Sequence, residues 1–167
     1  TGVGVSNISG FGKSISLEDD TLIVGAPYTN NNQGASFVFQ QFNSNGIGVT
    51  GENEWGQKTV VSGSQAGDYF GCSHASIAED TEFIFAIGAT GKNNGSGAVH
   101  LYRQTLSESI GSLIPEEENV KKFGRSLYFT SVENIKYLAI GYEHGGTGKI
   151  KMYKESAPGQ KDFTSYR

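Results

Sequence analysis

Short runs in which polar and apolar residues alternate recur along the chain, separated by turns rich in glycine and asparagine. Ser14-Ile15-Ser16-Leu17 is one such run, and its period of two is typical of a strand with one buried face. Leu22-Ile23-Val24 is apolar throughout, which favours a strand covered on both faces. No segment keeps helical spacing over three turns. The pattern therefore predicts an all-β protein built from many short strands.

A four-residue motif, Phe-Gly-x-Ser, occurs three times, beginning at Phe11, Phe70 and Phe123. Each copy is followed by an apolar run that ends in glycine, then by a polar loop, and then by a third run that alternates again. A fourth strand fits the more variable stretch that follows, for example Glu54 to Val61, and we expect Asp162 to Thr164 to supply it in the last copy. A four-stranded unit repeated every 50–60 residues or so is typical of a β-propeller blade.

The repeat predicts the domain organisation. We expect three four-stranded antiparallel blades of a β-propeller or propeller-like array, which a single chain can leave incomplete. The proposed divisions are 1–10 (a leading strand or the tail of a preceding blade), 11–69, 70–122 and 123–167, together one repeat domain. Three blades do not close a ring of the usual size, so the chain is a piece of a longer one, assembles with other chains, or forms an open array. We favour assembly or missing segments, because unstacked end blades expose apolar faces.

The three copies resemble the FG-GAP repeat of integrin α-chain propellers. FGKS, LIVGAP and GASFVF in the first copy carry the resemblance most specifically, and FGCS, FAIGAT and GAVHLY follow it closely in the second. The third copy has Tyr142 and Glu143 where the pattern has Ala-Pro. The resemblance spans residues 11 to 155, approximately. It implies propeller blades and a non-catalytic module of cell adhesion and protein binding, outside the cell or on its surface.

Integrin-type FG-GAP repeats often hold calcium in an Asp-x-Asp-x-Asp-Gly loop between their first two strands. The corresponding turns here are 18–20, 79–82 and 132–134, and none has carboxylates at alternate positions together with the glycine. Calcium needs six to eight oxygen ligands, which these turns do not supply. We therefore expect no metal and no cofactor.

Composition narrows the function further. The formal net charge of −4 argues against nucleic-acid binding, which needs clustered Lys and Arg. No apolar stretch approaches the length that spans a membrane. Cys72 is the single cysteine, so no disulfide forms within the chain. Asn7 and Asn94 begin Asn-x-Ser triplets and are candidate glycosylation sites in a secreted protein.

Candidate catalytic groups do not assemble into a pattern. The three histidines, His74, His100 and His144, occupy non-equivalent places in the three copies, so no metal triad follows from them. Gly145 to Lys149 lacks the first glycine and the following Ser/Thr of a phosphate-binding loop. We therefore predict that the protein is not an enzyme.

Recognition is the remaining function. Loops between the second and third strands, and loops between blades, are expected to project from one face, where tyrosine suits an interface. We predict an extracellular or cell-surface interaction or structural module that binds protein partners, or self-assembles, through loops and blade edges. The alternative is a carbohydrate- or substrate-binding accessory propeller of an extracellular enzyme, with a glycan as ligand. The candidate binding residues are Tyr28, Asn30, Asn31, Asn32, Tyr69, Lys92, Asn93, Tyr142 and His144.

Overall fold

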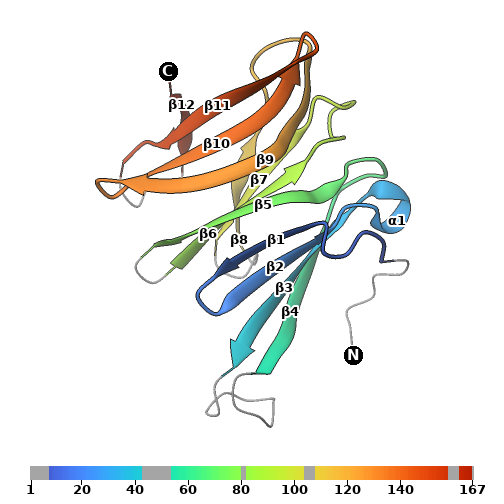
Figure 1. Ribbon diagram of the computed structural model, residues 1–167, viewed down its shortest axis with the longest axis vertical. Helices are drawn as coiled ribbons and strands as arrows, with labels where there is room; N and C mark the ends of the chain where they lie inside the picture. The colour runs from blue at the N-terminus through green and yellow to red at the C-terminus, as the bar shows by residue number, and fades with distance from the viewer. Residues whose placement is uncertain (1–7, 43–53, 80–81, 104–107, 158–161, 167) are drawn as a thin grey trace.

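The computed structural model describes residues 8–42, 54–79, 82–103, 108–157 and 162–166. These residues form three separate sheets, each of four antiparallel strands in sequence order (Figure 1). The first sheet, blade 1, contains β1 (Ser14–Glu18), β2 (Thr21–Ala26), β3 (Ala35–Phe42) and β4 (Glu54–Ser62). Blade 2 contains β5 (Phe70–Glu79), β6 (Glu82–Ala89), β7 (Ala98–Arg103) and β8 (Glu108–Leu113). Blade 3 contains β9 (Val120–Val132), β10 (Ile135–His144), β11 (Thr147–Glu155) and β12 (Phe163–Tyr166).

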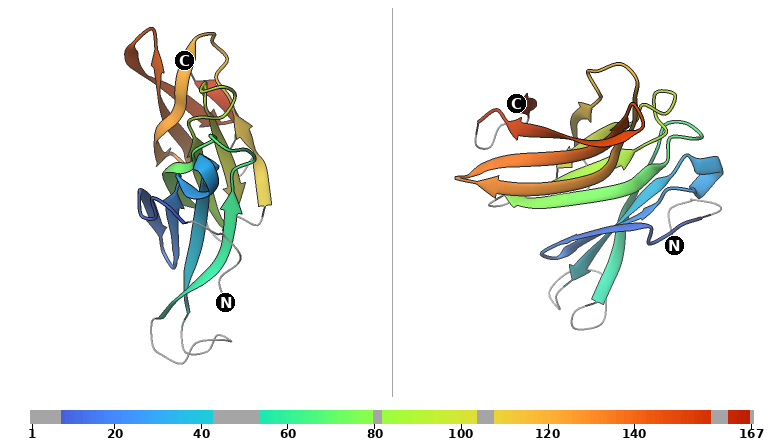
Figure 2. Two further views of the ribbon diagram at one scale, coloured as in Figure 1. Left: turned by 90° about the vertical axis from the view of Figure 1, so that its right-hand side faces the viewer. Right: turned by 45° about the horizontal axis from the view of Figure 1, so that its top comes forward.

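The three blades stack through their first strands. β1 packs beside β5 and β5 beside β9, so the fourth strands β4, β8 and β12 lie at the outside (Figures 1 and 2). The predicted all-β architecture of three four-stranded antiparallel blades is confirmed, and within the described residues the stack is open rather than closed into a ring. The fourth strands fall where the sequence predicts them, since β4 covers Trp55 to Val61 and β12 includes Phe163.

Helical structure in the described residues is confined to α1 (Thr29–Asn32), a single turn between β2 and β3. Asn30, Asn31 and Asn32 all have positive φ, which asparagine tolerates better than most residues. No helix in this part of the chain is long and apolar enough to cross a membrane.

Each blade docks onto the preceding one by the same backbone contact. The amide N–H of Phe70 donates to the carbonyl of Gln33 (N···O 3.1 Å), and that of Phe123 donates to the carbonyl of Ser96 (2.9 Å). Parallel bridges accompany both bonds, joining Gly34 to Phe70 and Gly97 to Phe123. We call residues 69–71 and 122–124 the docking segments of blades 2 and 3.

Glycine is required where the docking segments touch the blade before them. The carbonyl of Gly71 lies against Gly25, and the carbonyl of Gly124 lies against Gly88, closer than a Cβ atom at either position would permit. Gly71 and Gly124 themselves have φ of 84° and 87°, which side chains of L-residues disfavour. The glycines that recur in the sequence therefore set the spacing between blades.

Side chains on the facing surfaces form the core. We call the surface of a blade that faces the next blade its trailing face, and the opposite surface its leading face. Phe70 and Phe123 are each only 2% exposed and anchor two main apolar clusters. Ile23 and Val38 on the trailing face of blade 1 meet Phe70 with the leading face of blade 2.

The structure departs from expectation in blade 3. β6 is buried from Ile84 to Ala89, as predicted for a strand covered on both faces, whereas β10 alternates between buried and half-buried residues. The reason is that, within the described residues, no blade covers the trailing face of blade 3. The loop between the second and third strands, on which Tyr142 and His144 were expected to lie, is also shorter, because β10 continues to His144 and β11 begins at Thr147, leaving a two-residue turn.

Candidate interaction groove on the loop face

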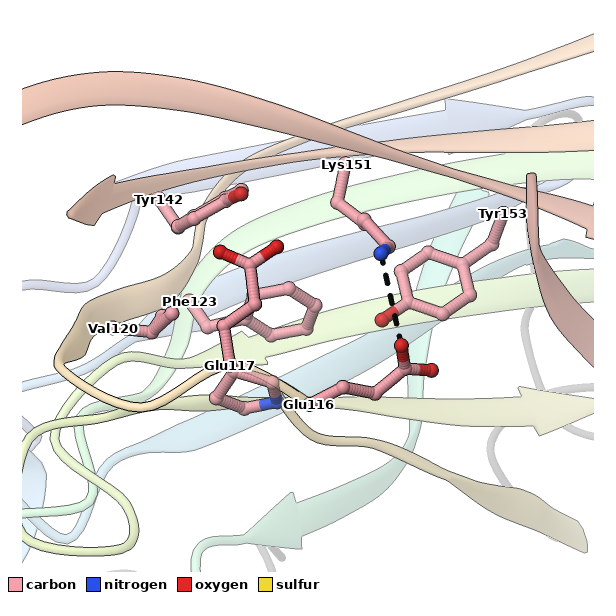
Figure 3. Close-up of a pocket in the computed structure, with 8 residues that line it drawn as sticks. Glu116, Glu117, Val120, Phe123, Tyr142, Lys151 and Tyr153 are labelled. Atoms are coloured by element: carbon pink, nitrogen blue, oxygen red, sulfur yellow. Dashed lines mark ion pairs between the residues drawn. The ribbon is translucent and has the colours of Figure 1, made fainter. Parts of the chain in front are cut away.

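A small hollow lies between the connection from β8 to β9 and the strands of blade 3 (Figure 3). Glu116 and Lys151 form an ion pair across it, with Oε2 and Nζ 3.7 Å apart. Burial raises the pKa of the nearby Tyr153 to about 12, and the Glu116 carboxylate adds to the effect. The cavity volume is about 10 Å³, enough for one water molecule. This hollow is therefore a packed corner and has no room for a ligand.

A larger hollow is a groove of about 570 Å³ at the end of the stack where the docking segments lie. We call it the loop-face groove. All three blades contribute to it, through the residues that precede or begin each first strand and through the loops that follow β2 and β6. The groove is lined by Lys13, Pro27, Tyr28, Tyr69, Cys72, Thr90, Gly91, Asn94, Gly95, Lys121 and Lys122.

Two tyrosines form the aromatic part of the groove. The rings of Tyr28 and Tyr69 meet edge to face with centroids 6.2 Å apart, and Tyr28 remains 42% exposed. Tyr69 has φ of 52° and is held there because its N–H donates to the carbonyl of Asn32 (2.8 Å). Such amphipathic rings offer apolar contact and a hydroxyl at the same place. The docking contact between blades 1 and 2 thus also positions the aromatic part of the groove.

Three lysines give the groove a positive charge, although the whole chain is negative. Lys13 and Lys121 are exposed. The ammonium of Lys122 lies 3.0 Å from the Glu143 carboxylate, which also pairs with Arg125. The hydrogen bond from Lys122, together with both cations, holds the pKa of Glu143 below its usual range. Clustered ammonium groups beside tyrosines favour a ligand that carries carboxylates or other anions.

Two groups that could support nucleophilic chemistry are held neutral. Burial raises the pKa of the Cys72 thiol, which points toward the carbonyl of Gly124. Burial also lowers the pKa of His74 to about 3. Its Nδ1 lies 2.8 Å from Ser14 Oγ and its Nε2 lies 2.9 Å from Ser36 Oγ, so the ring links blades 1 and 2. His74 therefore lies between the blades as a hydrogen-bonded structural residue.

The structure brings only some of the predicted binding residues together. Tyr28 and Tyr69 line the groove, whereas Tyr142 lies within β10, is 8% exposed and packs on Phe123. His144 is at the end of β10, with Nδ1 3.0 Å from Lys149 Nζ. Neither Tyr142 nor His144 lines the groove.

The remaining predicted residues act through the backbone or lie beside the groove. The carbonyls of Asn31 and Asn32 accept backbone N–H groups from the segment that leads into blade 2. Lys92 Nζ donates to Ser64 Oγ (2.6 Å) and lies 3.6 Å from Asp68 Oδ2. The flanking positions are Asn30 in α1, Asn93 in an exposed turn, and the glycosylation candidate Asn94 on the lining, while Asn7 is outside the described residues.

Asp68 shapes the loop beside the groove. Its Oδ2 accepts hydrogen bonds from the backbone N–H groups of Ser64 and Gln65 and from the Ser64 hydroxyl. Burial alone would raise the pKa of Asp68, but these bonds and the Lys92 cation bring it below its ordinary value. The carboxylate therefore stays charged and keeps the loop closed.

Sequence reasoning missed the cationic half of the groove. Lys13 and Cys72 occupy the variable position of Phe-Gly-x-Ser, and Lys122 stands immediately before the third Phe, where the second copy has Tyr69. Aligning the three copies position by position would have placed these residues on one face. In the part of the chain that the structure describes, no group of three or more His, Cys, Asp or Glu side chains is arranged to hold a metal ion.

The fold defines the class of protein: a stack of β-propeller-type blades with a groove across one end. A family model, the FG-GAP repeat, matches residues 6–39, which include β1, β2, α1 and most of β3. The resemblance stated from the sequence is therefore confirmed for the first copy, and this segment is similar to an FG-GAP repeat. None of the curated proteins compared with the chain matches it.

Proposed function

We propose that this protein is a non-catalytic interaction module of FG-GAP propeller type, which binds a protein partner through the loop-face groove. FG-GAP repeats are typical of extracellular or surface proteins and commonly mediate protein interactions, which supports this role and an extracellular or cell-surface location. A single observation carries the proposal. Two tyrosines, Tyr28 and Tyr69, and three lysines line one hollow of about 570 Å³, to which all three blades contribute residues.

The chemistry of the groove suggests the kind of partner. An exposed acidic segment of another protein would place its carboxylates near Lys13 and Lys121 and its apolar groups against Tyr28. Charge attraction of this kind speeds association and selects against basic partners. Tyrosine anchors then contribute a large share of the affinity.

A carbohydrate-binding accessory role is the second candidate. The exposed ring of Tyr28 offers a flat apolar surface in a groove that the amide of Asn94 also lines, and such groups suit a sugar ring and its hydroxyls. A neutral glycan would gain little from the lysines, so the two candidates differ in their dependence on charge.

A fluorescent glutamate-rich peptide tests the leading proposal, with its glutamine-rich counterpart as a neutral probe. We expect the acidic peptide to bind with an affinity that falls as salt rises. Lys121→Glu should weaken binding at least about tenfold, because it reverses a charge in the groove. Lys149→Glu is the matched control, since Lys149 is an exposed lysine of blade 3 outside the groove, and it should change affinity less than about twofold.

Equal losses in Lys121→Glu and Lys149→Glu would contradict the groove as the binding site. Equal binding of the two peptides would contradict the acidic partner. Binding of neutral oligosaccharides that is lost in Tyr28→Ala but kept in Lys121→Glu would favour the carbohydrate role instead.

A further inference from the structure

The trailing face of blade 3 has the glycine positions of the face onto which blade 3 itself docks, but among the described residues nothing covers them. Gly88 and Gly97 of blade 2 are covered by the backbone of Phe123 and Gly124. Their counterparts in blade 3 are Gly141 and Gly148, as the shared register of the sheets shows. Among the described residues, a Cβ at Gly148 would meet nothing within 4 Å, and one at Gly141 would meet only Ser126 of the same blade.

Exposed apolar side chains line a shallow hollow with Gly141. Ile150 in β11 is 72% exposed and Tyr128 in β9 is 68% exposed. Their equivalents in blade 2 are Val99 and Ala75, both of which are buried beneath blade 3. The trailing face of blade 3 thus has exposed apolar side chains at positions where the trailing face of blade 2 has buried ones.

The leading face of blade 1 presents the complementary element. Gly10 and Gly12 have φ of 73° and 86°, the same left-handed conformation as Tyr69 and Gly71 in the docking segment of blade 2. The docking segment of blade 1, residues 10–12, is therefore already shaped, yet Phe11 is 52% exposed where Phe70 is 2% exposed. Ile15 and Leu17 are also exposed on this face.

We propose that the trailing face of blade 3 binds the leading face of blade 1 of a second copy of this chain. Both internal junctions show what such a face accepts: a Phe-Gly-x-Ser blade whose residue before the Phe has positive φ. Blade 1 is a blade of that form with its docking segment uncovered. This inference concerns the blade faces and is independent of the loop-face groove.

The internal junctions also fix the register of the contact. Ser14 Oγ donates to the carbonyl of Gly71 (2.7 Å) and Ser73 Oγ donates to that of Gly124 (2.5 Å). By equivalence, Ser126 Oγ donates to the carbonyl of Gly12 in the second copy. Among the described residues, Ser126 has no other side-chain hydrogen bond, so its hydroxyl is available.

Side-chain pairs follow from the same equivalence. Ser36 faces His74 across the first junction. Ile150 is the equivalent of Ser36 in blade 3, and Ile15 is the equivalent of His74 in blade 1, so Ile150 lies opposite Ile15 of the second copy. Ser16 faces Ser76 (Oγ···Oγ 2.6 Å), which places Tyr128 opposite Leu17 of the second copy. The hydrogen-bonded pairs of the first junction thus become apolar pairs, so removal from water favours association.

The contact is heterologous, since different faces meet, and it repeats until a ring closes. Two copies supply six blades, which lies within the range of about four to eight blades in closed propellers. We therefore expect a closed dimer in which each copy contributes one leading and one trailing face.

Sedimentation velocity of the 167-residue chain from about 1 to about 100 µM tests the proposal. We expect a dimer that dissociates on dilution. Ile150→Glu and Ile15→Lys should each raise the dimer dissociation constant at least about thirtyfold, because each places a charge against an isoleucine. Both sites are exposed strand positions, and circular dichroism should confirm that the variants fold. Ile114→Glu is the control, because Ile114 is also an exposed isoleucine but lies between the strands β8 and β9.

Mixing the two variants gives the sharpest measurement. A heterodimer of Ile150→Glu and Ile15→Lys contains one unaltered junction and one in which the introduced glutamate meets the introduced lysine, so mixing should restore the dimer. A monomeric wild-type chain at about 100 µM, a dimer unaffected by Ile150→Glu, or a mixture that stays monomeric would each overturn the proposal. Peptide binding to the groove, measured on monomeric Ile150→Glu, reports separately on the proposed function.

Discussion

The two internal junctions share a backbone and differ in the side chains that fill them. Blade 2 docks onto blade 1 through hydrogen-bonded side chains near the first strands: Ser14, Ser36 and His74 form one group, and Ser16 and Ser76 form another. Blade 3 docks onto blade 2 through apolar residues at the same level, with Ala75 near Leu127 and Phe129. Both nevertheless use a Phe in a docking segment and a glycine against a carbonyl.

Close backbone contact therefore fixes the spacing of the blades, while the inner side chains need only fill the space. A polar filling demands complete hydrogen bonding, because an unpaired buried polar group is costly. The first junction satisfies this demand with one neutral imidazole between two hydroxyls. The first junction is therefore expected to be sensitive to acid, whereas the apolar junction between blades 2 and 3 is not.

Removing the docking phenylalanines should destabilise the protein most. Phe70→Ala and Phe123→Ala should each lower the free energy of unfolding by about 4 kcal/mol, since truncating a buried Phe leaves a cavity. Phe11→Ala should cost about 1 kcal/mol in the monomer, because among the described residues its ring packs on Phe37 and Phe39 of blade 1 alone and is half exposed. Urea unfolding followed by circular dichroism measures all three. A loss for Phe11→Ala as large as for Phe123→Ala would contradict the assigned docking roles.

Adding a methyl group at the glycine contact should have the next largest effect. Gly88→Ala forces a Cβ into the Gly124 carbonyl, which should destabilise the protein by about 3 kcal/mol. In the monomer Gly141→Ala is the matched control, because among the described residues its Cβ meets only Ser126, whose hydroxyl can rotate away, and it should cost less than about 1 kcal/mol. Thermal unfolding distinguishes the two. Similar melting temperatures for both variants would show that the backbone contact does not set the spacing.

The smallest effect is the acid dependence of the first junction. His74 has a folded pKa of about 3 against an ordinary value of 6.5, so between these pH values the unfolded state binds more protons. Stability is therefore fully present above pH 6.5 and falls as the pH drops toward 3. One pH unit corresponds to about 1.4 kcal/mol, so lowering the pH from 6.5 to 5 should cost about 2 kcal/mol from this group.

His74→Leu should flatten that part of the pH profile, since the equivalent position in blade 3 is Leu127. Denaturant midpoints measured at pH 7 and pH 5 provide the test. An unchanged difference between the two midpoints in His74→Leu would assign the acid sensitivity to other groups. His100→Leu serves as the comparison. Burial also lowers the pKa of His100, but its ring bonds to Ser112 and does not lie between Ser14 and Ser36.

Much of the fold could be predicted because the repeated motif, Phe-Gly-x-Ser, contains the residues through which one blade docks onto the blade before it. Phe11, Phe70 and Phe123 mark the blades in sequence, and the glycines after the apolar runs mark the close contacts. The burial of each face of a strand was harder to predict, because an apolar run does not show whether a neighbouring blade covers both faces. β10 illustrates this, being apolar in sequence and open on one face.

The groove could be predicted only in part. Tyr28 and Tyr69 were found because they flank loops of the repeat, whereas Lys121 lies at the start of a strand and reaches the groove only when three blades stack. The turn at Gly145 and Gly146 could have been anticipated, because two glycines between alternating runs are typical of a two-residue hairpin. That turn removes the long loop on which Tyr142 and His144 were expected to stand.

The order in which the sheets contact one another has a consequence for how the molecule comes apart. Extensive contacts between sheets link blade 1 to blade 2 and blade 2 to blade 3, so only the middle sheet is shielded on both sides within the described residues. In such linear arrays stability is a sum of units and nearest-neighbour interfaces. In the monomer, fraying therefore proceeds inward from either outer sheet, each of which is lost by breaking one interface, and the amide protons of β6 are the last to exchange with solvent.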